Sequence, residues 1–308
     1  MLSEKLISLV VPAYNEAECI GLGIARIQGV LEKVGQAFEI IVVDDGSHDA
    51  TWEAIMASSK ASKTVKGVRL SRNFGKEYAI CAGLDAAMGD AVILLDADMQ
   101  HPPELIPKMI ERWSEGNVDV IEGVKVHRGK ESIISKAIAL IFYRIMGSLS
   151  GIDFSGASDF KLLDRKVVEA WKGMGERSVF FRGMSAWVGF RREQVEFEVA
   201  ERGAGESKWS VWSLLALATG AITAFSTTPL RIITASGLIF FAFACVMGVN
   251  TMYQYFAGSA VTGFSTVILL LLIISSLVML ALGIIGEYIA KIYEEVKQRP
   301  RYIISERC

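Results

Sequence analysis

Residues 91–100 read Ala-Val-Ile-Leu-Leu-Asp-Ala-Asp-Met-Gln, an apolar run of strand length that ends in two carboxylates one residue apart. Two similar runs come earlier. Residues 6–11 lead into Pro-Ala-Tyr-Asn-Glu, and residues 38–43 lead into Asp-Asp-Gly-Ser. Strands that are apolar along their whole length are buried on both faces, as in parallel sheets covered by helices. These stretches therefore predict an α/β sheet with polar residues where its strands end.

The first 205 residues continue this alternation. Strands are expected at 6–11, 38–43, 65–70, 91–95 and 118–124, with helices at 16–35, 49–60, 75–88 and 102–115. Apolar strands separated by helices are typical of a mostly parallel sheet with helices on both faces. In such sheets ligands bind beyond the carboxyl ends of the strands. Those ends carry the following polar residues: Asn15, Glu16, Asp44, Asp45, Asp96 and Asp98. We therefore expect a functional site along this edge.

The apolar surplus lies near the carboxyl end. Hydrophobic residues make up 52% of the 308 positions, which excludes a disordered chain, and no charged residue occurs from Ile232 to Gly286. Because about 20 residues span a bilayer, this run predicts two transmembrane helices, near 232–256 and 264–286. A buried hairpin in a soluble core is the alternative.

Basic residues set the expected orientation of these helices. The turn at 257–263 carries no positive charge, whereas Arg231 and the basic residues after Gly286 flank the two spans. Basic flanks stay in the cytoplasm, so both termini and the α/β part of the chain are expected there. Residues 209–230 combine tryptophans with many serines and threonines, which favours an interfacial helix on the cytoplasmic leaflet, with a core helix as the alternative.

Charge and cysteine usage argue against other classes. The formal net charge is −2, so no nucleic-acid partner is expected. The four cysteines are scattered without a Cys-x-x-Cys pair, which argues against a disulfide framework or a structural zinc.

Asp96 and Asp98 are the sharpest chemical signal. Two carboxylates at a strand end can share a divalent cation and leave coordination positions open for phosphate oxygens. Such a metal would neutralise the charge that grows on a departing diphosphate. The spacing therefore predicts a Mg²⁺ or Mn²⁺ site.

Four motifs resemble the family 2 inverting glycosyltransferases of the GT-A fold: Val-Pro-Ala-Tyr-Asn-Glu at 11–16, Asp-Asp-Gly-Ser at 44–47, Arg-Asn-Phe-Gly-Lys at 72–76 and Asp-Ala-Asp-Met-Gln-His-Pro-Pro-Glu at 96–104. With its two carboxyl-terminal spans, the chain is more similar still to polyisoprenyl-phosphate glycosyltransferases. Those are the bactoprenol glucosyltransferases and, more distantly, dolichol-phosphate mannose synthase. The resemblance also includes residues 156–165 and 202–208. It implies a GT-A domain over 1–205, an interfacial region at 206–230, a two-helix hairpin at 231–290 and a basic tail at 291–308.

The same resemblance implies roles for single residues. The nucleotide pocket would contain Pro12, Tyr14, Glu16 and Asp44. The metal and diphosphate would be held by Asp96, Asp98 and Gln100. Arg202 and Lys208 would reach over the diphosphate. Asp159 would be a base or an orienting carboxylate, and Asp98, Asp159 and Arg202 are the expected catalytic residues.

The expected acceptor favours orientation over proton removal by Asp159. A lipid monophosphate already carries a nucleophilic oxyanion, since its second pKa is about 6. The site then mainly needs cations that align this phosphate. Such cations follow the fifth strand at Lys125, Arg128, Lys130 and Lys136, and an ordinary solvated surface is the alternative for them.

The resemblance implies transfer of a hexose, glucose from UDP-glucose as the first choice, to undecaprenyl phosphate at the bacterial cytoplasmic membrane, for modification of lipopolysaccharide or other cell-envelope glycans. Another UDP-sugar or GDP-mannose stays open as the donor. The rival readings are a processive polysaccharide synthase and a membrane-tethered sugar-nucleotide-binding protein without catalysis. Expected partners are the nucleotide sugar, the polyisoprenyl phosphate, membrane lipid, a flippase and a downstream glycosyltransferase. A homo-oligomer is left open.

Overall fold

The computed structural model describes residues 5–98, 100–125, 158–177, 179, 181–197, 227–257 and 263–308. These residues form two compact units. The first, here called the sheet unit, contains the described residues up to 197 together with 298–308. The second, the helical unit, contains 227–257 and 263–297.

One sheet of eight strands forms the centre of the sheet unit, in the order β7-β5-β6-β4-β1-β2-β3-β8. Four neighbouring strands pair in parallel: β1 (Ile7–Ala13), β2 (Phe38–Asp44), β3 (Val65–Leu70) and β4 (Ala91–Leu94). All seven residues of β1 are buried, which is what a continuous apolar run predicts for a central strand. The mostly parallel α/β sheet is confirmed.

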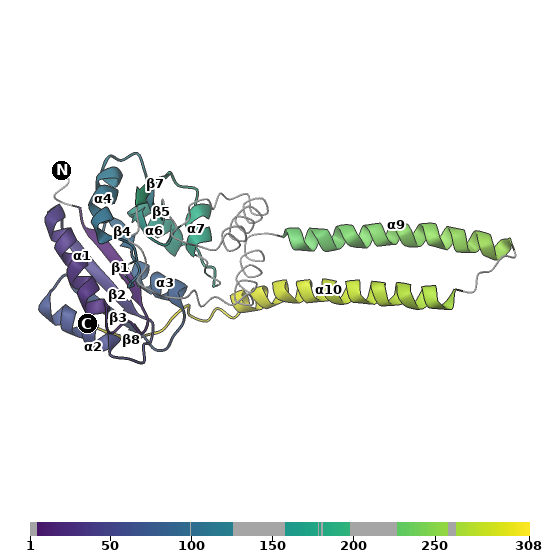
Figure 1. Ribbon diagram of the computed structural model, residues 1–308, viewed down its shortest axis with the longest axis horizontal. Helices are drawn as coiled ribbons and strands as arrows, with labels where there is room; N and C mark the ends of the chain where they lie inside the picture. The colour runs from purple at the N-terminus through teal and green to yellow at the C-terminus, as the bar shows by residue number, and fades with distance from the viewer. Residues whose placement is uncertain are drawn as a thin grey trace. The chain divides into compact units, whose positions relative to one another are not determined.

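Helices cover both faces of this sheet (Figure 1). On one face α1 (Ile20–Val34) packs beside α2 (Thr51–Ala61) and α4 (Ile106–Ser114), and on the other α3 (Lys76–Ala86) packs beside α6 (Arg165–Lys172). A 3₁₀ turn, η1 (Pro103–Leu105), precedes α4. Helix α1 shows why these segments are helical: Ile20, Ile24, Ile27 and Leu31 recur at helical spacing and are all buried in the core.

Three strands were not expected from the sequence. β6 (Lys161–Asp164) runs antiparallel to both β4 and β5 (Val120–Lys125), and β7 (Arg192–Phe197) pairs in parallel with β5. The antiparallel direction of β6 determines where its amino end lies. It brings the amino end of β6 to the edge where β4 ends, with Lys161 opposite Leu94.

The third unexpected strand is β8 (Ile304–Arg307), which lies within the segment expected only as a basic tail. It pairs antiparallel with β3 at the edge of the sheet. The segment before it is also attached: the Arg301 guanidinium donates to the backbone oxygens of Glu176 and Met174, and the Tyr302 hydroxyl donates to Asp85 Oδ2 at 2.6 Å. The carboxyl terminus is therefore an integral part of the sheet unit.

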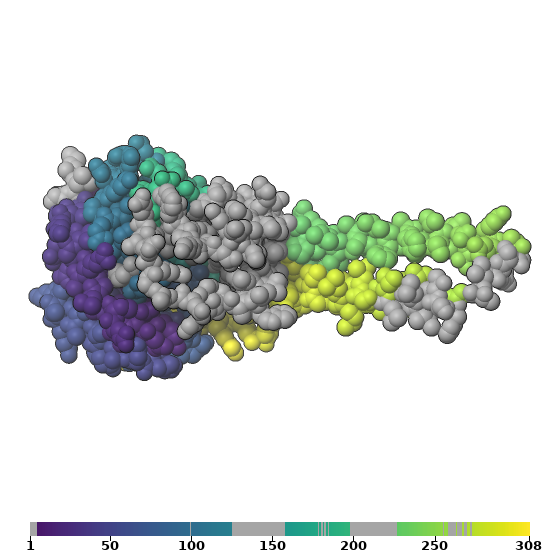
Figure 2. Space-filling model, viewed as in Figure 1, coloured from purple at the N-terminus to yellow at the C-terminus, as the bar shows by residue number. Residues whose placement is uncertain are grey.

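The helical unit consists of α9 (Thr228–Phe256) and α10 (Phe264–Val296), which lie side by side (Figures 1 and 2). Both are long and apolar enough to cross a membrane, over Thr228–Gln254 and Ile273–Val296. Helix α10 has 33 residues, about 50 Å at 1.5 Å per residue, so it exceeds the roughly 30 Å of a hydrocarbon core. The two helices fit a membrane-associated protein.

Candidate active site

A cavity of about 300 Å³ lies at the carboxyl edge of the parallel strands, at the lower end of the roughly 300–1,000 Å³ of small-molecule pockets. Its walls come from the end of β1 and from the segments that follow β1, β2, β3 and β4. The lining residues are Pro12, Ala13, Tyr14, Glu16, Asp45, Asn73, Gly75, Lys76, Ala79, Asp96, Ala97 and Asp98. Five residues with a role predicted from the sequence are thus brought together on one cavity: Pro12, Tyr14, Glu16, Asp96 and Asp98. Asp45, predicted only to lie at this edge, lines the same cavity.

Hydrogen bonds lock the loop after β1 onto the loop after β2. The backbone N–H of Asn15 donates to Ser47 Oγ at 2.9 Å, and the N–H of His48 donates back to Asn15 Oδ1 at 2.9 Å. Asn15 has a φ of +54°, a left-handed conformation that asparagine tolerates better than most residues. The N–H of Glu16 donates to Thr51 Oγ1 at 2.8 Å. The wall that contains Tyr14 and Glu16 is therefore preorganised.

The two adjacent aspartates at the carboxyl end of β2 have different surroundings. Asp44, expected in the nucleotide pocket, does not line the cavity: its side chain is fully buried, and its Oδ1 accepts the Ser47 N–H at 2.9 Å. Asp45 lines the cavity instead and accepts the N–H groups of Phe74 and Gly75, each at 2.8 Å. Burial raises the pKa of Asp45 above its usual value. Asp44 thus supports the turn, and Asp45 faces the site.

Gly46 allows this turn and the loop after β3 to approach closely. Its φ is +68°, and a Cβ at this position would lie 2.7 Å from Arg72 Cα. Only glycine adopts this conformation without strain and leaves room for that backbone. The close approach fixes the position of residues 72–75, which lead directly into α3.

Lys76, the first residue of α3, connects two carboxylates of the site. Its Nζ lies 2.7 Å from Asp96 Oδ1 and 2.8 Å from Asp159 Oδ2. Burial lowers the pKa of Lys76, but the charges of Asp159 and Asp96 outweigh it and raise the pKa above its usual value. Lys76 is therefore a fixed positive charge in an acidic site. Lys76 is the last residue of the Arg-Asn-Phe-Gly-Lys motif at 72–76, and its contacts with these carboxylates were not predicted from the sequence.

Asp159 reaches this edge because β6, which begins two residues later, is antiparallel to β4. Beneath it, a buried ion pair links β6 to β5. Lys161 Nζ lies 2.7 Å from Glu122 Oε1, the two side chains are 0% and 1% exposed, and the ammonium also donates to Ser185 Oγ at 2.6 Å. Breaking such a pair leaves a buried charge without compensation, so this ion pair holds the start of β6 in place.

Residues 8–171 match the model of glycosyl transferase family 2. The chain belongs to this family. The family resemblance seen in the sequence is confirmed, and so is the expectation of a sugar-transferring enzyme.

Relatives of this family 2 glycosyltransferase match it along nearly its whole length. An uncharacterized glycosyltransferase of Bacillus subtilis (strain 168) is 39% identical over 307 residues, which cover 97% of this chain and 93% of the relative. A bactoprenol glucosyl transferase of Shigella phage SfII is 39% identical over 305 residues, 97% of each chain. Among solved structures, a glucosyl-3-phosphoglycerate synthase from Mycobacterium tuberculosis, crystallised with Mn²⁺, UDP and phosphoglyceric acid, has a TM-score of 0.51 at 21% identity. The match covers 71% of this chain and 76% of that one, and it supports the GT-A fold.

The donor atoms of the glycosyltransferase site fit a hard divalent cation. Asp96 and Asp98 both line the cavity, and Asp98 Oδ1 accepts the backbone N–H of Gln100 at 3.0 Å. Within the described residues, no group of three or more His, Cys, Asp and Glu side chains is placed to hold a metal. Two carboxylates beside an open cavity suit an ion that keeps water or phosphate oxygens as its other ligands.

Several residues expected at the site lie outside the described part of the chain. They are Arg128, Lys130, Lys136, Arg202 and Lys208, together with most of the expected interfacial segment at 209–230. Lys125 ends β5, where it pairs with Phe197. The side chain of Lys125 also lies outside the described part of the chain. The roles of all these cations therefore stay predictions.

Proposed function

We propose that this glycosyltransferase moves a hexosyl group, glucose from UDP-glucose as the first choice, from a nucleotide sugar to a polyisoprenyl phosphate such as undecaprenyl phosphate. The observation that carries the proposal is the cavity with Asp96, Asp98 and Lys76 in a chain that also has two apolar helices. Full-length similarity to a bactoprenol glucosyl transferase supports both the lipid acceptor and the sugar.

The donor half of the site follows from the cavity walls. Pro12, Tyr14 and Glu16 would contact the base and ribose. Asp96, Asp98 and Gln100 would hold the diphosphate through Mg²⁺ or Mn²⁺, and the glucosyl-3-phosphoglycerate synthase crystallised with Mn²⁺ and UDP supports this assignment. When bound, the ion would neutralise charge on the departing diphosphate. Lys76, between Asp96 and Asp159, would place a further positive charge beside the same oxygens.

The acceptor half needs alignment rather than proton removal. An ionised phosphate oxygen attacks the anomeric carbon, a new C–O bond forms, and the bond to the diphosphate oxygen breaks on the opposite face. The configuration is therefore inverted. Asp159 orients the reactants, because the phosphate oxygen carries no proton that must be taken up. Arg202 and Lys208 would bind the diphosphate, and Lys125, Arg128 and Lys136 the lipid phosphate.

The proposed location is the bacterial cytoplasmic membrane, with the sheet unit and both termini in the cytoplasm. The absence of basic residues at 257–263 and the basic flanks of the two helices support this orientation. A product made on the cytoplasmic leaflet would have to be translocated before use outside. The proposal therefore includes a flippase and a downstream glycosyltransferase as partners.

The test is transfer by the purified full chain in detergent. UDP-glucose, UDP-N-acetylglucosamine and GDP-mannose are each supplied with undecaprenyl phosphate and Mg²⁺, and NMR of the product determines the anomeric configuration. We expect a β-linked product from an α-linked donor, and loss of transfer both in EDTA and in Asp98→Asn. The matched control is Glu111→Gln, an exposed residue of α4. Retained α configuration, or full activity of Asp98→Asn, would contradict the proposal.

A further inference from the structure

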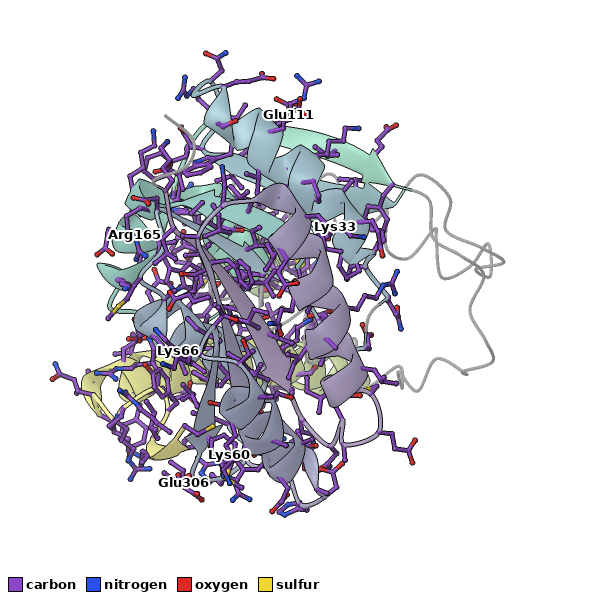
Figure 3. All side chains as sticks on the ribbon, turned by 90° about the vertical axis from the view of Figure 1, so that its left-hand side faces the viewer. Lys33, Lys60, Lys66, Glu111, Arg165 and Glu306 are labelled. Carbon is purple, nitrogen blue, oxygen red and sulfur yellow. The ribbon has the colours of Figure 1, made fainter. Side chains whose placement is uncertain are left out.

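A single row of residues crosses four neighbouring strands from the cavity to the end of the chain. Ala13 of β1 pairs with Asp44 of β2, Asp44 pairs with Arg69 of β3, and Arg69 pairs with Glu306 of β8. Ala13 lines the cavity. Glu306 lies at the edge of the sheet, on its last strand (Figure 3). Asp44, Arg69 and Glu306 are called the charged row below.

The side chains of the charged row contact one another in sequence. Glu306 Oε1 lies 3.1 Å from Arg69 Nη1, and Arg69 Nε lies 3.3 Å from Asp44 Oδ2. The second oxygen of Glu306, Oε2, accepts the Trp52 indole N–H at 3.1 Å. Exposure falls along the row, from 51% for Glu306 through 28% for Arg69 to 0% for Asp44. The row thus connects a half-exposed carboxylate to a fully buried one.

The buried end of the row depends on Arg69. Within the described residues, Asp44 Oδ2 accepts no hydrogen bond of acceptable geometry, so the guanidinium of Arg69 is what balances its charge. Loss of such a partner leaves the charge of a buried carboxylate without compensation, which makes its buried position strongly unfavourable. Glu306 holds the Arg69 guanidinium from the other side, and the same guanidinium lies 5.8 Å from the centroid of the Trp52 ring.

From Asp44 the contacts continue to the cavity wall. Asp44 Oδ1 accepts the N–H of Ser47, and Ser47 Oγ accepts the N–H of Asn15, which precedes Glu16. Asp45, the residue after Asp44, lines the cavity itself. A shift of Asp44 would therefore move both the turn at 44–47 and the loop after β1.

We propose that the carboxyl-terminal strand sets the geometry of the donor pocket through this row, which makes Glu306 and Arg69 positioning residues for the nucleotide. The inference rests on the proposed function in one respect: the ligand that binds beside the turn at 44–47 is a nucleotide. Neither residue lines the cavity. Their effect is on how well the pocket is preorganised, and therefore on donor affinity rather than on the chemical step.

The experiment measures nucleotide binding and turnover separately in the full chain. Titration calorimetry with UDP and with GDP in Mg²⁺ gives Kd, and steady-state transfer gives KM and kcat. Glu306→Gln keeps the shape of the side chain but removes its charge. It also places an amide NH₂ group against one of the two donors that Glu306 contacts, the Arg69 guanidinium or the Trp52 indole N–H. We expect Kd and donor KM to rise three- to tenfold, with kcat at saturating donor within twofold of wild type.

Two further variants separate this role from simple support of the strand. Ser305→Ala removes the neighbouring contact on β8, in which the Ser305 hydroxyl donates to the Arg69 backbone oxygen at 3.2 Å, and leaves the charges intact. We expect its Kd to stay within twofold. If Glu306 acts through Arg69, Glu306→Gln has no further effect on Kd in an Arg69→Gln background. Glu306→Asp, which keeps the charge, recovers part of the affinity.

An unchanged Kd in Glu306→Gln, or an equal rise in Ser305→Ala, would overturn the inference. So would additive effects of the Arg69 and Glu306 variants. A wild-type protein that binds UDP or GDP but transfers no sugar to undecaprenyl phosphate would contradict the proposed reaction, and the effect of the row on Kd would still be measurable.

Discussion

Lys76 joins two carboxylates that flank different strands of the sheet, Asp96 after β4 and Asp159 before β6. Its removal leaves both without the ammonium that connects them. We expect Lys76→Met to lower kcat by about 10²- to 10³-fold. A loss of this size is usual when a mutation removes one fixed hydrogen-bond donor or positive charge that stabilises a charged transition state. Lys76→Arg keeps the charge and retains more activity. Steady-state transfer assays check this, with Glu111→Gln as the control. Near-normal turnover of Lys76→Met would show that the lysine has no part in the reaction.

Single residues also show how far the sequence could predict the site. Asp96 and Asp98 were predictable because they directly follow a buried strand. The choice between Asp44 and Asp45 was not, since neighbouring residues at a strand end point in opposite directions and only the local backbone decides which one faces the cavity. Lys76 was missed for a related reason: its partners are 20 and 83 residues away in the sequence.

At the scale of elements, the turn at Gly46 and the start of α3 behave as one structure. Gly46→Ala would place a Cβ against the Arg72 backbone at a φ of +68°. We expect a loss of stability of about 1–3 kcal/mol from strain and overpacking, measured as a lower midpoint of thermal unfolding, together with weaker UDP binding.

Gly21→Ala is the matched control, because a Cβ there meets nothing within 4 Å on helix α1. Alanine in a helix is favoured over glycine by about 1 kcal/mol, so this variant should unfold at the same temperature or higher. A Gly46→Ala protein as stable as the control would contradict the close approach of the two loops.

The segment that precedes β8 gives a pH-dependent prediction. Burial, and then the hydrogen bond to Asp85, raise the pKa of the Tyr302 hydroxyl above its usual value of about 10. The folded state therefore favours the neutral phenol. Its contribution to stability is complete below pH 10 and is lost as the pH rises toward the higher pKa of the folded state.

Comparing Tyr302→Phe with the wild type checks this prediction. We expect the stability difference between the two, measured by thermal unfolding, to shrink between pH 9 and pH 11. A constant difference over that range would mean that Tyr302 does not titrate with unfolding.

Elements differ in how well the sequence predicts them. The parallel strands β1 to β4 were predicted within two residues, since apolar residues predominate in each of them and helices separate them. β6 and β8 have four residues each, too few for a periodic signal, and strand direction leaves no mark on periodicity. The position of Asp159 follows from that direction, so only the fold could explain why it reaches the site.

At the scale of the whole molecule, the apolar helices predict a specific topology. With both termini in the cytoplasm, a membrane-impermeant thiol reagent added outside intact cells should label Cys in a Ser259→Cys variant but leave Cys308 unlabelled. The reason is that the turn at 257–263 carries no basic residue, whereas the flanks of the helices do. Labelling of Cys308 from outside would require an odd number of crossings and would contradict an interfacial role for 209–230.

The pairing of β8 with β3 also dictates when the sheet can be completed during protein synthesis. Arg69 and Glu306 are 237 residues apart, and ribosomes add roughly 5–20 residues per second, so β3 waits about 10–50 s for its edge partner. Both apolar helices are translated in that interval. A nascent chain therefore finishes its last strand only after the hydrophobic hairpin has been made, and a premature stop codon that spares every cavity residue would still release a protein with an open sheet edge.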